Sequence, residues 1–410
     1  MKTDVLIIGA GPNGLAAALA LGGATLRSPL NVIVIDVRNP RTFAAGGHDT
    51  RGTAITRTTQ SMLAALGLWQ DLAPHAEEMR DIIVTDGVGG FAQRPALLSF
   101  ATDDNRRAAA SIIENRHIAR ALMAAVDRSP AITVLPETAI DEIKTDRGLA
   151  EVTTGNGEVI RASLVVAADG KASKTRALAG IKVQGHAYQQ TALGFSISHQ
   201  FPHNGQAQEH FSPDGVFAFL PLPENRASIV WGTSPDESGR LMDLGEADFL
   251  LELCHKLGSK LGSLALESPR SAYPLTLQIA EQFIAPRLAL IGDAAHAIHP
   301  LAGLGLNLGY KDVASLADTV AAAFLRGDDI GGAAVLEEYQ RNRRFDTFAT
   351  AAAMEAMNAL FSNNLPLLRG ARKTGLKLID QWPLAKSVLM REASGEALDL
   401  PRLMQGLLPG

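Results

Sequence analysis

The stretch Val5-Leu-Ile-Ile-Gly9-Ala-Gly11-Pro12-Asn13-Gly14 decides the fold of this chain of 410 residues. It begins with an apolar run, Val5 to Ile8, as expected for a short strand that is buried on both faces. Its glycines have the spacing G-x-G-x-x-G, which allows a tight turn, close approach of the backbone to a pyrophosphate, and close packing of a helix on a strand. Residues 15–21, rich in alanine and leucine, predict that helix, whose N-terminus would face the pyrophosphate.

A second strand follows the glycine turn. Val32-Ile-Val-Ile35 is again apolar, and Asp36 comes after it at a distance typical of the acid that binds the adenosine ribose. An acid here disfavours a 2′-phosphate, so NADP is not expected at this site. The pattern predicts a Rossmann-like dinucleotide site formed by Gly9, Gly11, Pro12, Asn13, Gly14 and Asp36.

Composition narrows the class of protein. The net charge of −5 gives no reason to expect nucleic acid as a partner, and the single cysteine, Cys254, excludes a disulfide framework. Lys2 and the apolar run after it could pass for a secretory signal, but Asp4, the glycines and Pro12 argue against that interpretation. No run of 18 apolar residues free of glycine and charge predicts a membrane-spanning helix. We therefore expect a cytoplasmic protein.

A second glycine-centred segment lies far along the chain. Leu164 to Ala168 predicts a buried strand, Asp169-Gly170 ends it, and Ser173 and Arg176 fall on the turn or helix that follows. An NAD-dependent dehydrogenase has no need of this segment. Taken alone, the segment is equally a strand–turn–helix corner in which Ser173 caps the helix.

The third segment joins a strand end to a glycine-rich loop and a helix. Leu288 to Ile291 predicts the strand, and Gly292 and Asp293 lie at its carboxyl end, where open α/β sheets bind ligands. Asp293 can accept hydrogen bonds from ribityl hydroxyls. The loop then supplies Pro300, Gly303, Gly305, Leu306 and Asn307. The positive end of the following helix, predicted from about residue 308 to residue 322, would stabilise a reduced, anionic flavin by about 0.3–1 kcal/mol.

In this order and at these distances, the three segments indicate FAD as a single shared ligand. The chain holds no second G-x-G-x-x-G, so NAD(P)H is expected to bind transiently as a co-substrate. His296 and His299 have no clustered carboxylate or cysteine nearby, and no metal site is expected.

With these motifs the chain resembles the FAD-dependent aromatic hydroxylases of the p-hydroxybenzoate hydroxylase type, and among them most the ubiquinone-biosynthesis hydroxylases. The resemblance covers nearly the whole chain. A D-x-R-x-x-A segment beginning at Asp49 implies that Arg51 lies near the flavin, and an N-R-x-x-x-R-A-L segment beginning at Asn115 implies that Arg120 contacts the FAD phosphates or ribityl chain. The chain departs from the ubiquinone branch at Leu304, where that branch usually carries glutamine.

The resemblance implies a monooxygenase that consumes NAD(P)H and O₂ and hydroxylates an aromatic ring, with a polyprenylated phenol of ubiquinone biosynthesis as the preferred substrate. No catalytic acid or base can be named, because the cofactor carries the chemistry. Two alternatives stay open: a flavin monooxygenase of a soluble aromatic compound, and a non-catalytic FAD-binding member of a quinone-biosynthesis complex.

The resemblance and the hydrophobic patterns predict an α/β protein in which a Rossmann-like FAD-binding domain is interleaved with a mixed β-sheet substrate domain. We expect the FAD-binding domain at 1–75, 105–180 and 270–345, the substrate domain at 76–104 and 181–269, and a C-terminal helical region at 346–410. Strands are expected around Asn156-Gly157 and around a turn at Glu224-Asn225. Phe217, Phe219 and Pro221 are candidates for an apolar wall over the flavin, although ordinary sheet core explains them as well.

The segment 365–391 is apolar and basic, with six lysines and arginines against one acid, Asp380. Basic amphipathic helices can lie on anionic lipid, and they can also pack on a domain with one solvated face. Because ubiquinone-branch substrates reside in the bilayer, the resemblance favours contact of this segment with the inner membrane surface or with a quinone-biosynthesis complex.

Overall fold

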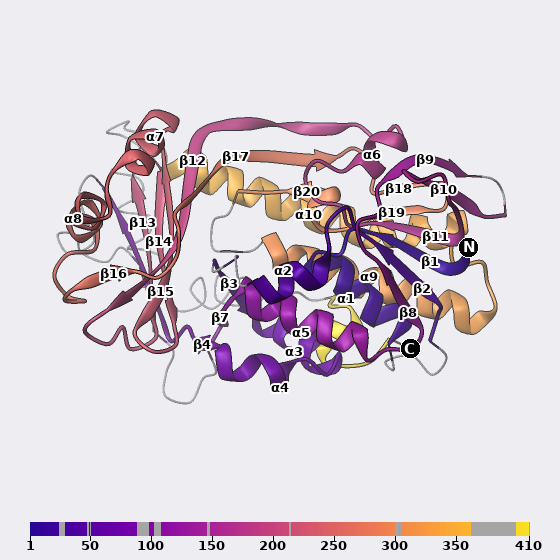
Figure 1. Ribbon diagram of the computed structural model, residues 1–410, viewed down its shortest axis with the longest axis horizontal. Helices are drawn as coiled ribbons and strands as arrows, with labels where there is room; N and C mark the ends of the chain where they lie inside the picture. Colours follow the sequence, from indigo (N-terminus) through magenta and orange to yellow (C-terminus); the bar gives the residue numbers. More distant parts are fainter. Residues whose placement is uncertain are drawn as a thin grey trace.

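The computed structural model describes residues 1–23, 29–46, 49, 51–87, 98–101, 108–145, 148–212, 215–299, 303, 305–361 and 399–409. These residues form two large sheets and a small one, with helices packed around them, and the predicted α/β class is confirmed. Figure 1 shows the two large sheets at opposite ends of an elongated molecule.

The first sheet contains the strands of all three motifs. Its parallel strands lie in the order β19 (Leu288–Leu290), β11 (Val159–Ala167), β1 (Lys2–Ile8), β2 (Val32–Ile35), β8 (Ile132–Leu135). Antiparallel strands extend it, namely β18 (Ile284–Ala285), β10 (Ala150–Thr154) and β9 (Ile140–Thr145). Because parallel strands share one carboxyl edge, residues that follow β1, β11 and β19 meet at the same end of the sheet.

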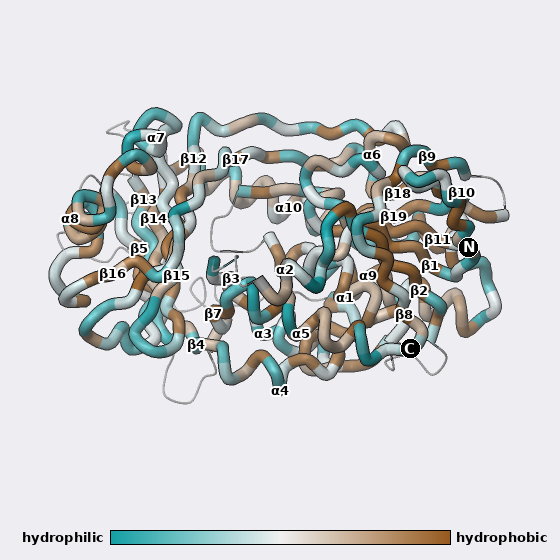
Figure 2. The backbone as a smooth tube through the Cα atoms, in the orientation of Figure 1, coloured by the Kyte–Doolittle hydropathy of each residue, from teal (hydrophilic) through white to brown (hydrophobic). Residues whose placement is uncertain are grey.

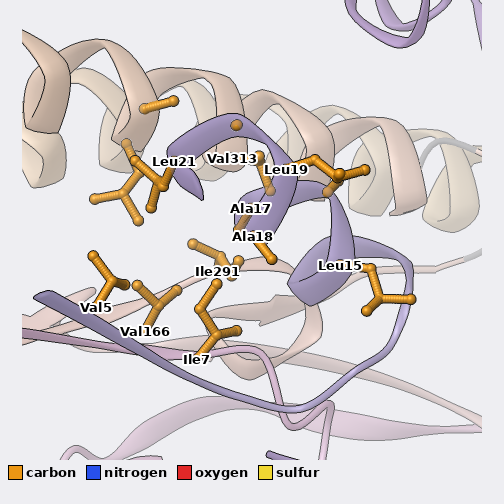
Figure 3. Close-up of a cluster of buried hydrophobic side chains, with 14 of the residues drawn as sticks. Val5, Ile7, Leu15, Ala17, Ala18, Leu19, Leu21, Val166, Ile291 and Val313 are labelled. Carbon is orange, nitrogen blue, oxygen red and sulfur yellow. The ribbon is translucent and has the colours of Figure 1, made fainter. Parts of the chain in front are cut away.

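Helices cover this sheet because its strands are apolar on both faces. Figure 2 shows the apolar colour concentrated on β1, β2 and β11. The helices are α1 (Pro12–Gly22), α2 (Pro40–Gly46), α3 (Arg57–Ala65), α4 (Trp69–Leu72), α5 (Asn115–Asp127), α6 (Lys174–Leu178), α9 (Gly305–Arg326) and α10 (Ala333–Phe361). Helix α1 packs against α9 and α5. Small side chains such as Ala17 and Ala18 let α1 approach the strands, where Val5, Ile7 and Val166 are fully buried (Figure 3).

The second sheet lies at the opposite end of the molecule from the first (Figure 1). Its order is β20 (His296–Ala297), β17 (Ser271–Ala280), β12 (Val183–His199), β15 (Arg226–Thr233), β14 (Gly215–Leu222), β13 (Gln206–Ser212), β5 (Asp81–Asp86), β6 (Leu98–Ala101), and β16 (Leu264–Leu266) pairs with β12. Helices α7 (Pro235–Asp243) and α8 (Glu246–Leu257) lie at this sheet. Strand β17 belongs to this sheet, although the expected boundaries put 270–345 in the FAD-binding domain.

Strands β12 and β17 connect the two halves. Residues 183–194 of β12 pair along β17, with an irregularity between Ala187 and Thr191, and the two strands run along the top of Figure 1. A small antiparallel sheet of β3 (Gly52–Thr56), β7 (Ala110–Glu114) and β4 (Glu77–Glu78) lies between the halves. The Gly52 N–H donates to Ser228 Oγ of β15 over 2.7 Å, which fastens this small sheet to the second sheet.

Both turns expected between strands are present. Residues at Asn156-Gly157 join β10 to β11, and Gly157 has a φ of 84° that favours glycine. Glu224 and Asn225, with φ of 67° and 54°, join β14 to β15.

The chain ends on the helices of the first sheet. Helix α10 continues to Phe361, past the boundary expected at 345, and the basic segment 365–391 lies outside the described residues. The 3₁₀ helix η5 (Arg402–Gln405) packs on α3 and α9, with Leu403 and Met404 buried in the main core. Within the described residues, no helix combines the length and apolar character needed to cross a bilayer.

Candidate active site

A cavity of about 1200 Å³ lies where the three motifs meet. That volume exceeds the roughly 300–1,000 Å³ of sites for drug-sized ligands, and so leaves room for a dinucleotide together with a substrate. The predicted site residues that line it are Gly9, Gly11, Pro12, Asn13, Asp36, Arg51, Asp169, Asp293, Gly303, Gly305 and Leu306. Residues nearly 300 positions apart in the chain therefore face one space.

The three glycines of the first motif serve different needs. A Cβ on Gly9 would lie 2.3 Å from Ala168 O, and one on Gly14 would lie 1.9 Å from Gly9 O. Strand and helix packing therefore requires both glycines. A Cβ on Gly11, in contrast, would meet no atom within 4 Å and would point into open space. Packing does not explain Gly11, but close approach of a ligand to the backbone does.

Asp36 stands at the carboxyl end of β2 and lines the cavity. Its Oδ2 accepts the Ala10 N–H over 2.7 Å, and its Oδ1 accepts the Arg38 N–H over 2.8 Å. These bonds hold the carboxylate beside the glycine turn, as the ribose-binding acid of a dinucleotide site requires.

Asn13 joins the first motif to the third. Its side chain fills the space where a Cβ on Gly292 would lie 2.1 Å from Nδ2 and a Cβ on Gly309 would lie 2.4 Å from Nδ2. Both glycines are therefore required by one asparagine. Asn13 Oδ1 is buried between these elements and has no hydrogen-bond partner among the described residues.

The second motif is both a structural corner and part of the cavity. Ser173 caps α6 by accepting the Arg176 N–H over 2.9 Å, as the structural interpretation predicts. Asp169 Oδ1 accepts from Ser173 Oγ over 2.5 Å, and Asp169 Oδ2 accepts from Thr175 N and Oγ1 over 3.0 and 2.8 Å. The guanidinium of Arg176 donates to Ala294 O over 2.8 Å, which ties this corner to the third motif.

Asp293 follows β19 and opens into the cavity, so solvent reaches it from that side. Protein encloses its other sides, and this burial raises the pKa of Asp293 above the usual value, against the opposing charges of Lys171 and Arg51. A carboxyl group placed in this way can accept hydrogen bonds from a ligand that fills the cavity.

The loop after Asp293 leads to the N-terminus of α9. Gly303, Gly305 and Leu306 line the cavity, and α9 begins at Gly305. Asn307 does not line the cavity. Its Oδ1 accepts the Thr56 N–H over 3.1 Å and its Nδ2 donates to Ala54 O over 2.7 Å, so it fastens the start of α9 to β3. Pro300 and Leu304 lie outside the described residues.

Arg51 reaches across the cavity toward the second sheet. It donates to both oxygens of Asp49 over 2.8 and 2.7 Å, and Asn115 Nδ2 donates to Asp49 Oδ2 over 3.1 Å. Burial opposes ionisation of Asp49, but these bonds outweigh it and hold its pKa below the usual value. The Arg51 stem lies 3.2 Å from where a Cβ on Gly194 would stand, and its guanidinium lies 5.6 Å from the Tyr273 ring centroid.

Four predicted residues of the FAD site that the structure describes are absent from the cavity lining, namely Gly14, Arg120, Gly292 and Asn307, and Tyr273 is among the lining residues that were not predicted. Arg120 is exposed on α5, whereas Asn115 and Ala119 of the same helix line the cavity. Gly292 contacts Asn13 behind the wall. Tyr273 lines the cavity, although the sequence offers no motif for it; only its place on β17, facing the same side as Ser271, could have indicated it.

One side of the cavity is formed by one face of the second sheet. Gly194, Val230 and Ala218 are direct neighbours across β12, β15 and β14, and all three line the cavity. Met79, Ile82, Ala207 and Leu220 extend this surface with apolar side chains, and Gln208 and Glu209 of β13 add polar groups, with Glu209 directly beside Ala218.

The predicted wall residues Phe217, Phe219 and Pro221 alternate with these positions and are absent from the lining. Phe217 and Phe219 are 2% and 1% exposed and belong to the cluster that contains Phe249 of α8. Successive side chains of a strand point to opposite faces. The cavity is therefore lined by the face of β14 that carries Ala218 and Leu220, and the face with Phe217 and Phe219 packs in the core.

The two histidines of the third motif are used within the protein. His296 Nε2 donates to Asp312 Oδ2 over 2.6 Å, and His299 Nε2 donates to Gln190 Oε1 over 3.2 Å. Burial lowers the pKa of His299 to about 4. In the described part of the chain, no three histidine, cysteine or acidic side chains are grouped as a metal site requires.

These observations fit FAD. The open space beside Gly11 suits a pyrophosphate, Asp36 suits the ribose, and the Asp293 carboxyl offers an acceptor further along the cavity. The N-terminus of α9 favours negative charge on a ring placed near it.

Comparisons with known proteins agree. A family model described as "FAD binding domain" matches residues 2–356. A ubiquinone hydroxylase, UbiL, of Rhodospirillum rubrum is 38% identical over 98% of this chain and 93% of its own length. The 3-demethoxyubiquinol 3-hydroxylase of Escherichia coli is 35% identical over 96% of this chain and 98% of its own length.

A solved structure, p-nitrophenol 4-monooxygenase PnpA of Pseudomonas putida, has the same fold, with a TM-score of 0.77, 19% identity, and coverage of 96% of this chain and 98% of that one. The chain belongs to the FAD-binding-domain family and is an FAD-dependent monooxygenase.

Proposed function

We propose that this enzyme hydroxylates the ring of a polyprenylated phenol in ubiquinone biosynthesis, with NAD(P)H as electron donor and O₂ as oxygen donor. The observation that carries the proposal is one cavity that joins a glycine-rich part, with Asp36, Asp169 and Asp293, to a part on the second sheet that is lined mainly by small and apolar residues. Relatives of similar length whose names specify ubiquinone hydroxylation support the same substrate class.

The apolar part suits a ring with a long hydrocarbon substituent. Gly194, Ala218 and Val230 have small side chains, so they form a shallow floor across three strands. Apolar lining also excludes water, and a dry site prevents loss of a reactive oxygen species to solvent. A planar ring on this floor would be held between the second sheet and the cofactor part of the cavity.

Each group of residues has a separate task in this proposal. The first motif and Asp36 would hold the ADP half of FAD, and Asp293 would hold the ribityl chain. Bound FAD supplies the redox chemistry that joins NAD(P)H oxidation to transfer of one oxygen atom from O₂. Arg51 and Tyr273, which lie together at the junction of the two parts, would orient the oxygen substituent of the substrate ring.

Turnover tests this proposal directly. Purified FAD-loaded protein should oxidise NADH or NADPH faster when a short-chain prenylated phenol is added, and mass spectrometry should find one added oxygen in the product. Stimulation by soluble phenols alone would favour the soluble-aromatic alternative. Comparing quinone intermediates in cells with and without the gene would identify the ring position.

We also propose that the basic segment 365–391 contacts the membrane surface or a partner in quinone biosynthesis. Replacing Lys377, Lys386 and Arg391 by glutamine should reduce flotation with anionic vesicles while leaving the FAD content unchanged. Substitution is preferable to truncation, because a truncation would also remove Leu403 and Met404 from the core. Equal flotation of both proteins would contradict membrane contact through this segment.

A further inference from the structure

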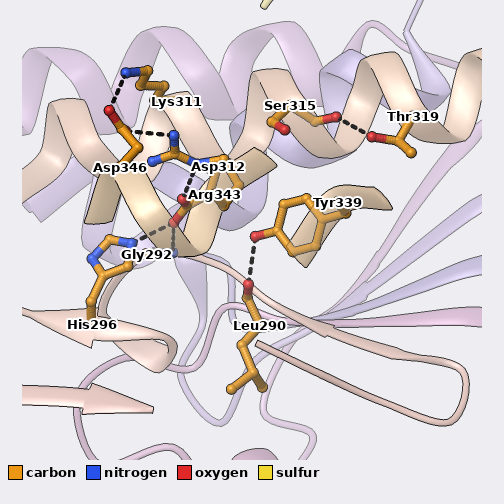
Figure 4. Close-up of polar contacts among 10 residues, drawn as sticks. All are labelled: Leu290, Gly292, His296, Lys311, Asp312, Ser315, Thr319, Tyr339, Arg343 and Asp346. Carbon is orange, nitrogen blue, oxygen red and sulfur yellow. Dashed lines mark hydrogen bonds and ion pairs between the residues drawn. The ribbon is translucent and has the colours of Figure 1, made fainter. Parts of the chain in front are cut away.

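A buried carboxylate supports the turn that carries Asp293. Asp312 of α9 is fully buried, and three donors converge on it. Gly292 N–H and His296 Nε2 donate to its Oδ2 over 2.9 and 2.6 Å, and Arg343 Nε donates to its Oδ1 over 2.7 Å (Figure 4). One side chain thus binds both ends of the 292–296 turn.

The 292–296 turn needs a hydrogen-bond acceptor for the buried Gly292 N–H. Gly292 has a φ of 57°, and its N–H is directed into the protein toward α9 rather than along the sheet. A buried N–H without an acceptor is costly. With the Gly292 N–H fixed on Asp312, the next residue, Asp293, is directed into the cavity.

A charged network keeps Asp312 in its acceptor form. Arg343 of α10 also donates from Nη1 to Asp346 Oδ2 over 2.7 Å, and Lys311 Nζ donates to Asp346 Oδ1 over 2.8 Å. Burial opposes ionisation of Asp312, yet His296 and Arg343 outweigh it and keep its pKa below the usual value. Helices α9 and α10 are thereby joined beneath the turn (Figure 4).

We propose that Asp312 is a positioning residue for the cofactor: by accepting the Gly292 N–H, it holds Asp293 in the orientation that binds FAD before FAD arrives. The inference rests on the proposed contact between Asp293 and FAD. It does not depend on the substrate, so binding measurements can reject it while the hydroxylase function stands.

Two double variants separate this role from general stability. Asp312→Asn with Arg343→Met removes both buried charges and keeps an oxygen that accepts the Gly292 N–H. Asp312→Leu with Arg343→Met has nearly the same shape and charge but no acceptor. The FAD dissociation constant of the leucine variant should rise by about 10- to 100-fold, the range found at metal sites when the partner of a directly bound ligand is removed, and the asparagine variant should stay within a few-fold of wild type.

A matched control uses another buried arginine. Arg287 pairs with Asp329 and Ser163 O at the edge of the first sheet and is not part of the cavity lining. Arg287→Met should lower the melting temperature without changing FAD affinity or the near-ultraviolet circular dichroism of bound flavin. If the leucine and asparagine variants bind FAD equally, or if both change only as Arg287→Met does, Asp312 has no positioning role.

Wild-type protein provides a test that does not depend on variant folding. The Gly292 amide should exchange slowly with deuterium in the FAD-free protein, because Asp312 already holds it. Slow exchange only after FAD is added would mean that the cofactor orders the turn, and the proposal would be overturned.

Discussion

At the scale of single residues, the glycines of the first motif have two different roles. Gly9 and Gly14 are required by the packing of helix on strand, whereas Gly11 leaves space for a ligand. The G-x-G-x-x-G spacing predicts all three positions, but it cannot say which neighbour each one accommodates. A Cβ on Gly14 would touch Gly9 O and one on Gly9 would touch Ala168 O, whereas one on Gly11 would meet no atom of the described residues within 4 Å. The spacing also gives no sign that Asn13 fills the space beside Gly292 and Gly309, because that contact joins residues nearly 300 positions apart.

Alanine substitutions test this distinction. Gly11→Ala should fold as well as wild type, since Gly11 has a φ of −71° that alanine adopts freely, but it should weaken FAD binding. Gly14→Ala should destabilise the FAD-free protein by about 1–3 kcal/mol, because helix α1 must move away from Gly9. Urea unfolding and FAD titration of both variants measure the two effects. Equal FAD affinity in Gly11→Ala and wild type would argue against a pyrophosphate beside this residue.

The raised pKa of Asp293 should make the stability of the FAD-free protein depend on pH. Because burial raises its pKa, the folded FAD-free protein holds this proton more tightly than the unfolded chain does. Ionisation of Asp293 therefore lowers stability as pH rises from the unfolded value of about 3.9 through the raised folded value. Asp293→Asn should raise the melting temperature of FAD-free protein at pH 7, weaken FAD binding, and lose its stability advantage near pH 4. A stability advantage that grows toward low pH would contradict this reasoning.

At the scale of helices and strands, apolar runs and turn residues could predict most elements. The strands next to the three motifs, helix α1 and helix α9 lie close to their expected places because each has a run of apolar residues and a defined start. The face of β14 could not be predicted in the same way. Ala218 and Phe219 both lie in an apolar strand, and only the position of α8 decides which face of that strand is core.

Substitutions on the two faces of β14 should have opposite consequences. Ala218→Phe should fold but reduce kcat/KM for a prenylated phenol by at least about tenfold, or about 1.4 kcal/mol, because its ring would occupy the substrate floor. Phe219→Ala should lower stability by about 3–5 kcal/mol and leave kcat/KM of the folded enzyme nearly unchanged. Steady-state kinetics with thermal unfolding distinguishes the two, and reversed effects would restore Phe219 to the substrate wall.

At the scale of the whole molecule, three distant motifs meet because their strands end at one edge of a parallel sheet. The sequence could predict this convergence, since residues after β1, β11 and β19 must share that edge. It could not predict that β17 joins the second sheet, because an apolar strand does not reveal its partner. Nor could it predict that residues 399–409 return to the core beside α3 and α9.

Residues 399–409 should contribute several kcal/mol to the free energy of unfolding, although the segment is short. Deleting residues 399–410 removes Leu403 and Met404 from the core and the bond from Arg402 N to Asp318 Oδ2 of 2.7 Å. We expect a loss of several kcal/mol, because each buried leucine or methionine contributes about 2–5 kcal/mol. Thermal unfolding of the deletion variant measures this loss. An unchanged melting temperature would show that the end is not packed as described.

The most direct test of the central claim is an experimental structure of the protein with FAD. We expect an extended FAD with its adenosine at Asp36, its pyrophosphate at Gly11, its ribityl chain at Asp293 and its ring system toward Gly303 and Gly305, with Ala218 and Val230 across the remaining space. FAD bound anywhere else, or a pose in which Gly11 and Asp293 do not contact the same molecule, would contradict it.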